Sequence, residues 1–130
     1  MFYIKLKYLP AWNDVRRKHA NDYLIGFADV RDVILLVEAD YARHIYHIYA
    51  IRVKDRDKLM AYLGEKGIAC GIHYPVPVHL QKAYSFLGKG KGSFPVAEKC
   101  AEQYLSLPMF AELTDEQVAY VVQQIKGYYA

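Results

Sequence analysis

The first 27 residues carry an apolar pattern with a helical period. Mostly apolar side chains recur every three or four residues, which places them on one face of a helix. They are Ile4, Tyr8, Trp12, Val15, His19, Tyr23 and Phe27. Pro10 interrupts the pattern, and proline costs about 3 kcal/mol inside a helix but is tolerated in a first turn. We therefore predict a short helix, a break near Leu9, and a second helix to about Leu24 that Gly26 ends.

The middle of the chain reads as short strands around one helix. Val33 to Glu38 is rich in branched residues, and Ile45 to Val53 alternates as a strand does, so both are predicted strands. Asp55 is suited to cap a helix that ends at Gly67, with an apolar face of Leu59, Met60 and Leu63. Ile68 to Tyr74 is the next predicted strand. This order fits either a parallel crossover unit or a helix lying across an antiparallel sheet.

Two further helices are predicted toward the C-terminus. Ser93 and Pro95 open the first, whose apolar residues are Val96, Ala97, Cys100, Ala101, Tyr104 and Leu105, and Pro108 ends the stretch after it. Thr114 and Gln117 form a capping-box pattern before a helical stripe of Val118, Val121, Val122 and Ile125. No repeat or linker divides the chain. The predicted fold class is therefore α/β, an α+β sandwich in which helices cover a small sheet.

Composition and charge narrow the classes of function. A chain of 130 residues, 54% hydrophobic and 24% charged, has the size and composition of one globular domain. The net charge is only +3 and Arg16 to Lys18 is the one basic run of three, so no nucleic-acid partner is expected. Apolar runs such as Val33 to Val37 are far too short to span a membrane. With Cys70 and Cys100 as free thiols, we expect a cytoplasmic protein with no membrane partner.

Hydrogen-bonding side chains gather in a proline-rich loop from residue 71 to residue 81. Tyr74 and Val76 each precede a proline, which favours extended conformations and makes the loop stiff. Four side chains on this loop are suited to hold phosphate, hydroxyl or carboxylate groups of a ligand: His73, Tyr74, His79 and Gln81. A purely structural proline turn is the alternative that the residue types leave open.

Other chemistries have weaker support. His44 and His47 are three residues apart on a predicted strand, which points them to opposite faces, so no metal site is predicted. No serine lies in a Gly-x-Ser-x-Gly elbow and neither cysteine has obviously electropositive surroundings, so no catalytic residue is assigned. The segment from Gly88 to Gly92 has the glycine and lysine content of a phosphate loop but not its spacing. We interpret it as a flexible surface loop, with phosphate contact as the minor alternative.

Several motifs in one register resemble a known family. The chain resembles the C-terminal region of DegT/StrS-type nucleotide-sugar aminotransferases, and its first part is similar to the helix that joins the two domains of these enzymes. The resemblance covers nearly the whole chain. Its segments are Lys5–Arg17, His44–Val53, Gly71–Tyr84, Gly92–Lys99, Leu105–Met109 and Leu113–Val118.

The resemblance implies a fold type I enzyme that uses pyridoxal phosphate (PLP). In this family a lysine of the large N-terminal domain forms the Schiff base, glutamate usually supplies the amino group, and homodimers are the rule. Residues 1–28 would then be the joining helix segment and residues 29–130 the small C-terminal domain. The sequence contains no counterpart of the large PLP-binding domain. The resemblance therefore implies that this chain alone neither binds PLP nor transaminates.

The resemblance also implies roles for individual residues. His73 and Tyr74 would contact the nucleotide-sugar near its diphosphate or sugar, with His79 as a further candidate on the same loop. His47, Tyr49 and Arg52 match the family's strand motif, and core packing is the alternative role for these three.

Two rival functions stay open at the level of sequence. The first is a free-standing binding or regulatory module that keeps the fold without the chemistry. The second is an unrelated α/β enzyme that uses His73 and Tyr74 as acid and base, although no carboxylate cluster or nucleophile accompanies them.

Overall fold

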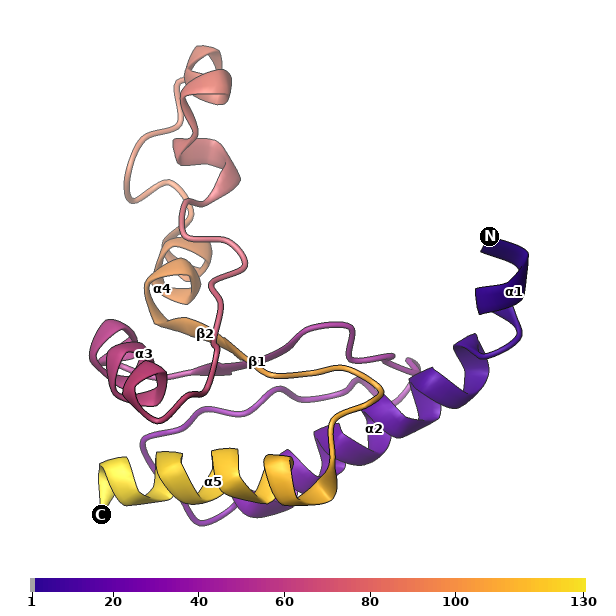
Figure 1. Ribbon diagram of the computed structural model, residues 1–130. Coiled ribbons are helices and arrows are strands. Elements are labelled where there is room, and N and C mark those ends of the chain that lie inside the picture. Colours follow the sequence, from indigo (N-terminus) through magenta and orange to yellow (C-terminus); the bar gives the residue numbers. More distant parts are fainter. Residues whose placement is uncertain (1) are drawn as a thin grey trace.

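Helices and one small sheet make up the structure, a computed structural model that describes residues 2–130, so Met1 of the predicted joining segment lies outside the described residues. In chain order the elements are α1 (Phe2–Leu6), α2 (Leu9–Gly26), β1 (Tyr49–Arg52), α3 (Arg56–Glu65), the 3-10 helices η1 (Val78–Leu80) and η2 (Lys82–Leu87), α4 (Pro95–Gln103), β2 (Tyr104–Leu107) and α5 (Asp115–Tyr129). In Figure 1, α2 and α5 run beneath the sheet, while η1 and η2 lie in an arm, residues 74–94, that extends away from the body. The predicted class of a small sheet covered by helices is confirmed.

The N-terminal helices break where the sequence predicts. The first helix ends at Leu6, and α2 begins at Leu9 with Pro10 in its first turn. The buried residues of α2 are His19, Ala20 and Tyr23. A Cβ on Gly26 would lie 2.8 Å from both γ-carbons of Val122, so the missing side chain lets α2 lie close against α5. The second helix thus belongs to the hydrophobic core as well as to the predicted joining segment.

The sheet consists of β1 and β2 in antiparallel pairing. Gly71, which follows α3, forms an antiparallel bridge to the other edge of β2, so the segments before and after α3 run parallel to each other with β2 between them. Tyr49 lies opposite Leu107 and Ile51 opposite Leu105, and all four side chains are buried. The ring of Tyr49 also stacks on Tyr23 of α2, with 5.0 Å between the ring centroids. This face of the sheet closes the core. Because side chains alternate along a strand, Tyr104 and Ser106 belong to the opposite face.

All three predicted strands are wrong in extent. Only Tyr49–Arg52 of the predicted strand from Ile45 to Val53 is a strand, because Tyr46 has a left-handed backbone with φ of 48°. The other two predicted strands each contribute a single antiparallel bridge, Ile34 with Arg52 and Gly71 with Ser106. The branched residues of these two segments are compatible with a strand, but each segment forms only one isolated bridge to the sheet of β1 and β2.

One strand was missed, because Tyr104 and Leu105 continue the apolar spacing of the predicted fourth helix. In the structure α4 ends at Gln103 and β2 follows without a loop. The Leu-Ser-Leu alternation from Leu105 to Leu107 is the strand signal, and it is only three residues long. Inside the structure it places two leucines in the core and Ser106 on the other face.

The third and fifth helices follow the prediction closely. Thr114 Oγ1 accepts from the Gln117 amide at 3.2 Å and Gln117 Oε1 accepts from the Thr114 amide at 2.9 Å, so the capping box is confirmed. Gly67 follows α3 with φ of 74°, as expected of a helix stop. Asp55 precedes α3, but its carboxylate accepts hydrogen bonds from Tyr128 and Tyr129 instead of capping the helix. The C-terminal tyrosines thereby fasten the end of α5 to the start of α3.

A charged network fixes the long loop between α2 and β1. The two carboxylate oxygens of Glu38 accept from Arg17 at 2.7 Å and 3.2 Å. The same carboxylate accepts from the His44 amide at 2.7 Å and from the Tyr46 hydroxyl at 3.0 Å. Chiefly through the hydrogen bond with Arg17, these contacts lower the pKa of Glu38 to about 2. The network explains how Tyr46 keeps its left-handed backbone.

Acid should weaken the fold through Glu38. Since its pKa is depressed from the ordinary glutamate value of 4.5, the carboxylate stabilises the folded state at neutral pH. That contribution is lost as the pH falls from the ordinary glutamate pKa toward about 2. We expect the urea midpoint to fall steeply between about pH 5 and about pH 2, and less steeply in a Glu38→Gln variant. Equal pH dependence in the two proteins would contradict this role.

Candidate functional site

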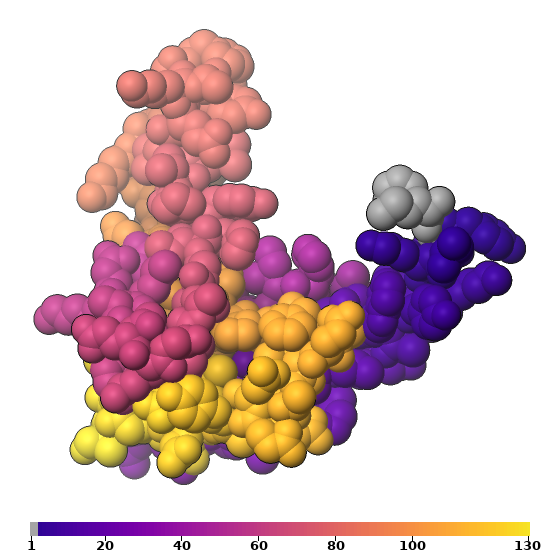
Figure 2. Space-filling model, in the orientation of Figure 1, coloured from indigo at the N-terminus to yellow at the C-terminus, as the bar shows by residue number. Residues whose placement is uncertain are grey.

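A surface cavity of about 610 Å³ lies between the arm and α4. Three of the seven candidate binding residues named from the sequence, His73, Tyr74 and His79, line it together. Its other lining residues are Val76, Pro77, Val78, Leu87, Lys89, Phe94, Ala97, Ala101 and Tyr104. Figure 2 shows the arm standing out from the body of the molecule. The proline-rich loop thus forms one wall of this cavity.

The two ring nitrogens of His73 differ in their hydrogen bonding. Its Nδ1 lies 2.9 Å from the hydroxyl oxygen of Ser106 on β2. Its Nε2 makes no hydrogen bond within residues 2–130. The ring of Tyr74 packs edge-on against it, with 5.7 Å between centroids, and Tyr74 is 73% exposed. The two side chains therefore offer an imidazole and a phenol to a ligand in the cavity.

His79 is held by a buried carboxylate. Glu98 Oε1 lies 2.9 Å from His79 Nε2, and both side chains are at most one-tenth exposed. Glu98 also accepts from the Gly92 amide at 2.9 Å and from the Phe94 amide at 3.2 Å. The hydrogen bond from the Gly92 amide is the main cause that lowers the pKa of Glu98 below its usual value, and the hydrogen bond with His79 lowers it further. Burial of the carboxylate acts in the opposite direction. His79 therefore has a structural attachment in addition to its place in the cavity wall.

The sequence did not identify the apolar floor of the cavity. Phe94, Ala97, Ala101 and Tyr104 come from α4 and its two ends, and none of them was named as a site residue from the sequence. Lys89, on the loop interpreted as a flexible surface segment, lines the same cavity and adds a positive charge. Its Gly-Lys composition was the only sequence signal for that position.

Gln81 is exposed and does not line the cavity, and the three residues named from the strand motif also lie elsewhere. Tyr49 is 2% exposed in the core. The Arg52 guanidinium donates to Gln103 Oε1 at 2.9 Å, and Arg52 is the ladder partner of Tyr104, next to the cavity wall. His47 is exposed, outside the cavity lining. The packing of Tyr49 and Arg52 agrees with the structural alternative, and a binding role for the three residues stays a prediction.

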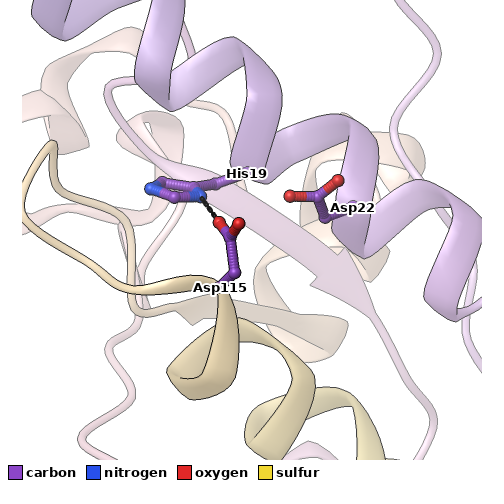
Figure 3. A group of neighbouring side chains, drawn as sticks. All are labelled: His19, Asp22 and Asp115. Carbon is purple, nitrogen blue, oxygen red and sulfur yellow. Dashed lines mark ion pairs between the residues drawn. The ribbon is translucent and has the colours of Figure 1, made fainter.

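One further group has the composition of a metal site. Figure 3 shows His19 of α2 turned toward Asp115 at the start of α5, with Asp22 farther along α2. Both ring nitrogens of His19 are buried without a hydrogen-bond partner in the described part of the chain, and Nδ1 lies 4.0 Å from Asp115. The Lys18 ammonium, however, donates to Asp22 at 3.0 Å and to Asp115 at 2.5 Å. The two carboxylates already share a lysine cation, and we assign no metal to them.

The residues of this chain do not fit the PLP site of the implied family. A Schiff-base lysine is activated by burial or by neighbouring groups. Within residues 2–130 no lysine is buried, and Lys18 and Lys126 are ion-paired with aspartates. No step of PLP chemistry can therefore be derived from the side chains described here.

Comparison with known proteins places the chain in one family. The model of the DegT/DnrJ/EryC1/StrS aminotransferase family matches residues 1–126. A pleiotropic regulatory protein of Geobacillus stearothermophilus is 44% identical over 97% of this chain and 34% of its own length. The dTDP-3-amino-3,4,6-trideoxy-alpha-D-glucose transaminase of Streptomyces venezuelae is 37% identical over 95% of this chain and 32% of its own length. The chain therefore spans about a third of the length of these relatives.

A solved structure identifies the corresponding part of a larger enzyme. The crystal structure of DesV from S. venezuelae, in complex with a ketimine intermediate, superimposes with a TM-score of 0.94 at 36% identity. The match covers 98% of this chain and 34% of that one. The fold is that of the C-terminal part of a fold type I aminotransferase. The chain belongs to the DegT/DnrJ/EryC1/StrS aminotransferase family.

Proposed function

We propose that this chain is the C-terminal domain of a PLP-dependent sugar aminotransferase that transfers an amino group from glutamate to a nucleotide-linked keto-sugar. The observation that carries the proposal is the meeting of His73, Tyr74 and His79 in one cavity with Lys89. The transaminase of S. venezuelae named above acts on a dTDP-linked sugar by its description, which supports a nucleotide-sugar as the ligand.

The chemistry of the cavity suits such a ligand. A nucleotide-sugar combines an anionic diphosphate with rings that have apolar faces. His73, Tyr74 and Lys89 can donate hydrogen bonds to phosphate or hydroxyl oxygens. Phe94 and Tyr104 provide aromatic surface against which a ring can pack. The chain would thus contribute one wall of a substrate site and leave the reacting atoms to another part of the enzyme.

The remaining parts of the proposal concern the whole enzyme. Residues 1–28 would join this domain to a large domain that holds PLP, and residues 29–130 would form the small domain. Two such enzymes would pair as a homodimer in the cytoplasm. No helix within residues 2–130 is long and apolar enough to cross a membrane. The absence of a buried lysine from the same residues supports the proposal that the chain alone neither binds PLP nor transaminates.

A second candidate is a binding or regulatory module of the same fold. Its support is the description of the G. stearothermophilus relative as a pleiotropic regulatory protein. Both candidates are compatible with nucleotide-sugar binding. The two candidates differ in what they predict for a fusion of this chain to the large domain of the S. venezuelae transaminase. The first candidate predicts that the fusion transaminates, and the second makes no such prediction.

Binding of a nucleotide-sugar tests the cavity directly. We expect dTDP-glucose to shift NMR signals of residues 73–79 and 89–104, with a Kd on the order of 1 mM because only one wall of the site is present. Tyr74→Ala should weaken binding about fivefold, the effect of one lost hydrogen bond. Tyr41→Ala is the matched control, because Tyr41 is 96% exposed and lies outside the cavity. Shifts scattered over the surface, or equal losses in both variants, would refute the proposed site.

A further inference from the structure

Ser106 contacts the candidate binding loop through both its backbone and its side chain. Its amide donates to the Gly71 carbonyl at 2.8 Å and its carbonyl accepts from the Gly71 amide at 3.0 Å. Its hydroxyl lies 2.9 Å from Nδ1 of His73, which follows Gly71 by two residues in the loop. Ser106 is 6% exposed and belongs to the sheet face opposite the core leucines. One residue of β2 therefore fixes both the start of the loop and the ring that the loop presents.

Gly71 makes this arrangement sterically possible. The His73 ring folds back over Gly71, so that a Cβ at position 71 would lie 2.9 Å from Cε1 of the imidazole. Such an approach is too close for a real Cβ atom, so either the ring or the bridged backbone would have to shift. Glycine is thus required here for the close approach of the ring.

The surroundings of the Ser106 hydroxyl indicate which ring nitrogen of His73 carries the proton. Within the described residues, His73 Nδ1 is the only hydrogen-bond partner of the Ser106 hydroxyl. If Nδ1 were protonated and donated to Ser106, the buried hydroxyl proton would have no acceptor there, which costs free energy. If the hydroxyl donates to Nδ1, its single proton is used and the imidazole proton lies on Nε2.

We propose that Ser106 is a positioning residue that holds neutral His73 in its Nε2–H tautomer and presents that N–H to the cavity as a hydrogen-bond donor. The inference deepens the proposed function, on which its ligand rests, because a donor at this place suits an anionic phosphate oxygen of a nucleotide-sugar. It also distinguishes the two histidines of the loop. His79 directs its Nε2 to the buried Glu98 and so cannot offer that nitrogen to a ligand.

The tautomer can be measured without any ligand. Two-bond ¹H–¹⁵N correlation spectra at about pH 8.5, where imidazoles are ordinarily neutral, separate the two tautomers by the ¹⁵N shifts of the ring. We expect His73 to show the Nε2–H pattern in the wild-type chain. The pattern should persist in Ser106→Thr, which keeps the hydroxyl, and become a mixture of tautomers in Ser106→Ala. Ser85→Ala, an exposed serine in η2, is the control and should leave the spectrum unchanged.

Binding of dTDP-glucose provides the second readout. Ser106→Ala should weaken it about fivefold and Ser106→Thr should restore it to within about twofold of wild type. An Nδ1–H tautomer in the wild-type chain overturns the inference even if no variant folds. An unchanged tautomer in a folded Ser106→Ala variant overturns it as well. If the wild-type chain shows the Nε2–H tautomer but binds no dTDP-glucose, the positioning role stands and the proposed function fails.

Discussion

Replacing Leu105 with alanine is expected to lower the free energy of unfolding by about 2–5 kcal/mol, the usual cost of a large cavity in a closed core. Leu105 is fully buried in β2 and lies opposite Ile51 of β1, which is also fully buried. Since the sheet has only two strands, few neighbours are available to fill the space. Urea unfolding followed by circular dichroism measures the change.

The matched control for Leu105 is Val96→Ala. Val96 lies on α4 and is 76% exposed, so its loss should change the free energy of unfolding by less than about 0.5 kcal/mol. A loss below about 1 kcal/mol in Leu105→Ala would mean that the two-stranded ladder does not contribute to the core as described. Because Leu105 lies between Tyr104 and Ser106, the variant should also disturb the cavity wall.

The helices were predictable because their signals are local and repeated. A stripe of apolar residues over several turns, a capping box at Thr114 and a glycine stop at Gly67 each act within one element. The strands are four residues long, so periodicity had little sequence on which to act. The predicted strand from Ile45 failed for a reason outside the strand, since Arg17 and Glu38 fix the backbone around Tyr46.

The residues of the candidate site were likewise predictable only where the sequence signal is local. His73, Tyr74 and His79 were recognised because the chain brings them together in one stiff loop. Ser106 and Glu98 were not, although they hold the two histidines, because each is more than fifteen residues away from its partner in the sequence. Contacts of that kind follow from the bridge between Gly71 and Ser106 of β2 and from the return of the arm to α4, neither of which periodicity reveals.

The arm itself depends on Glu98 in a way that can be separated from the stability of the core. The core cluster contains no residue of the arm, so the arm's attachment to the body must come from polar contacts and from the cavity walls. The Glu98 carboxylate accepts hydrogen bonds from the Gly92 and Phe94 amides, and Oε1 lies within hydrogen-bond distance of His79 Nε2. These partners belong to both the segment that enters the arm and the segment that leaves it. Removing the Glu98 carboxylate leaves these buried or half-buried donors without an acceptor.

Glu98→Ala is therefore expected to detach the arm while the core stays folded. Trypsin should cleave at the exposed Lys82, Lys89 and Lys91 about ten times faster than in the wild-type chain, with only a small change in the urea midpoint. Glu98→Gln keeps one acceptor oxygen and should give an intermediate rate. Glu102→Ala, an exposed glutamate on the same helix, is the matched control and should cleave at the wild-type rate. Faster cleavage in both alanine variants, or global unfolding without preferential cleavage in the arm, would show that Glu98 does not fasten the arm specifically.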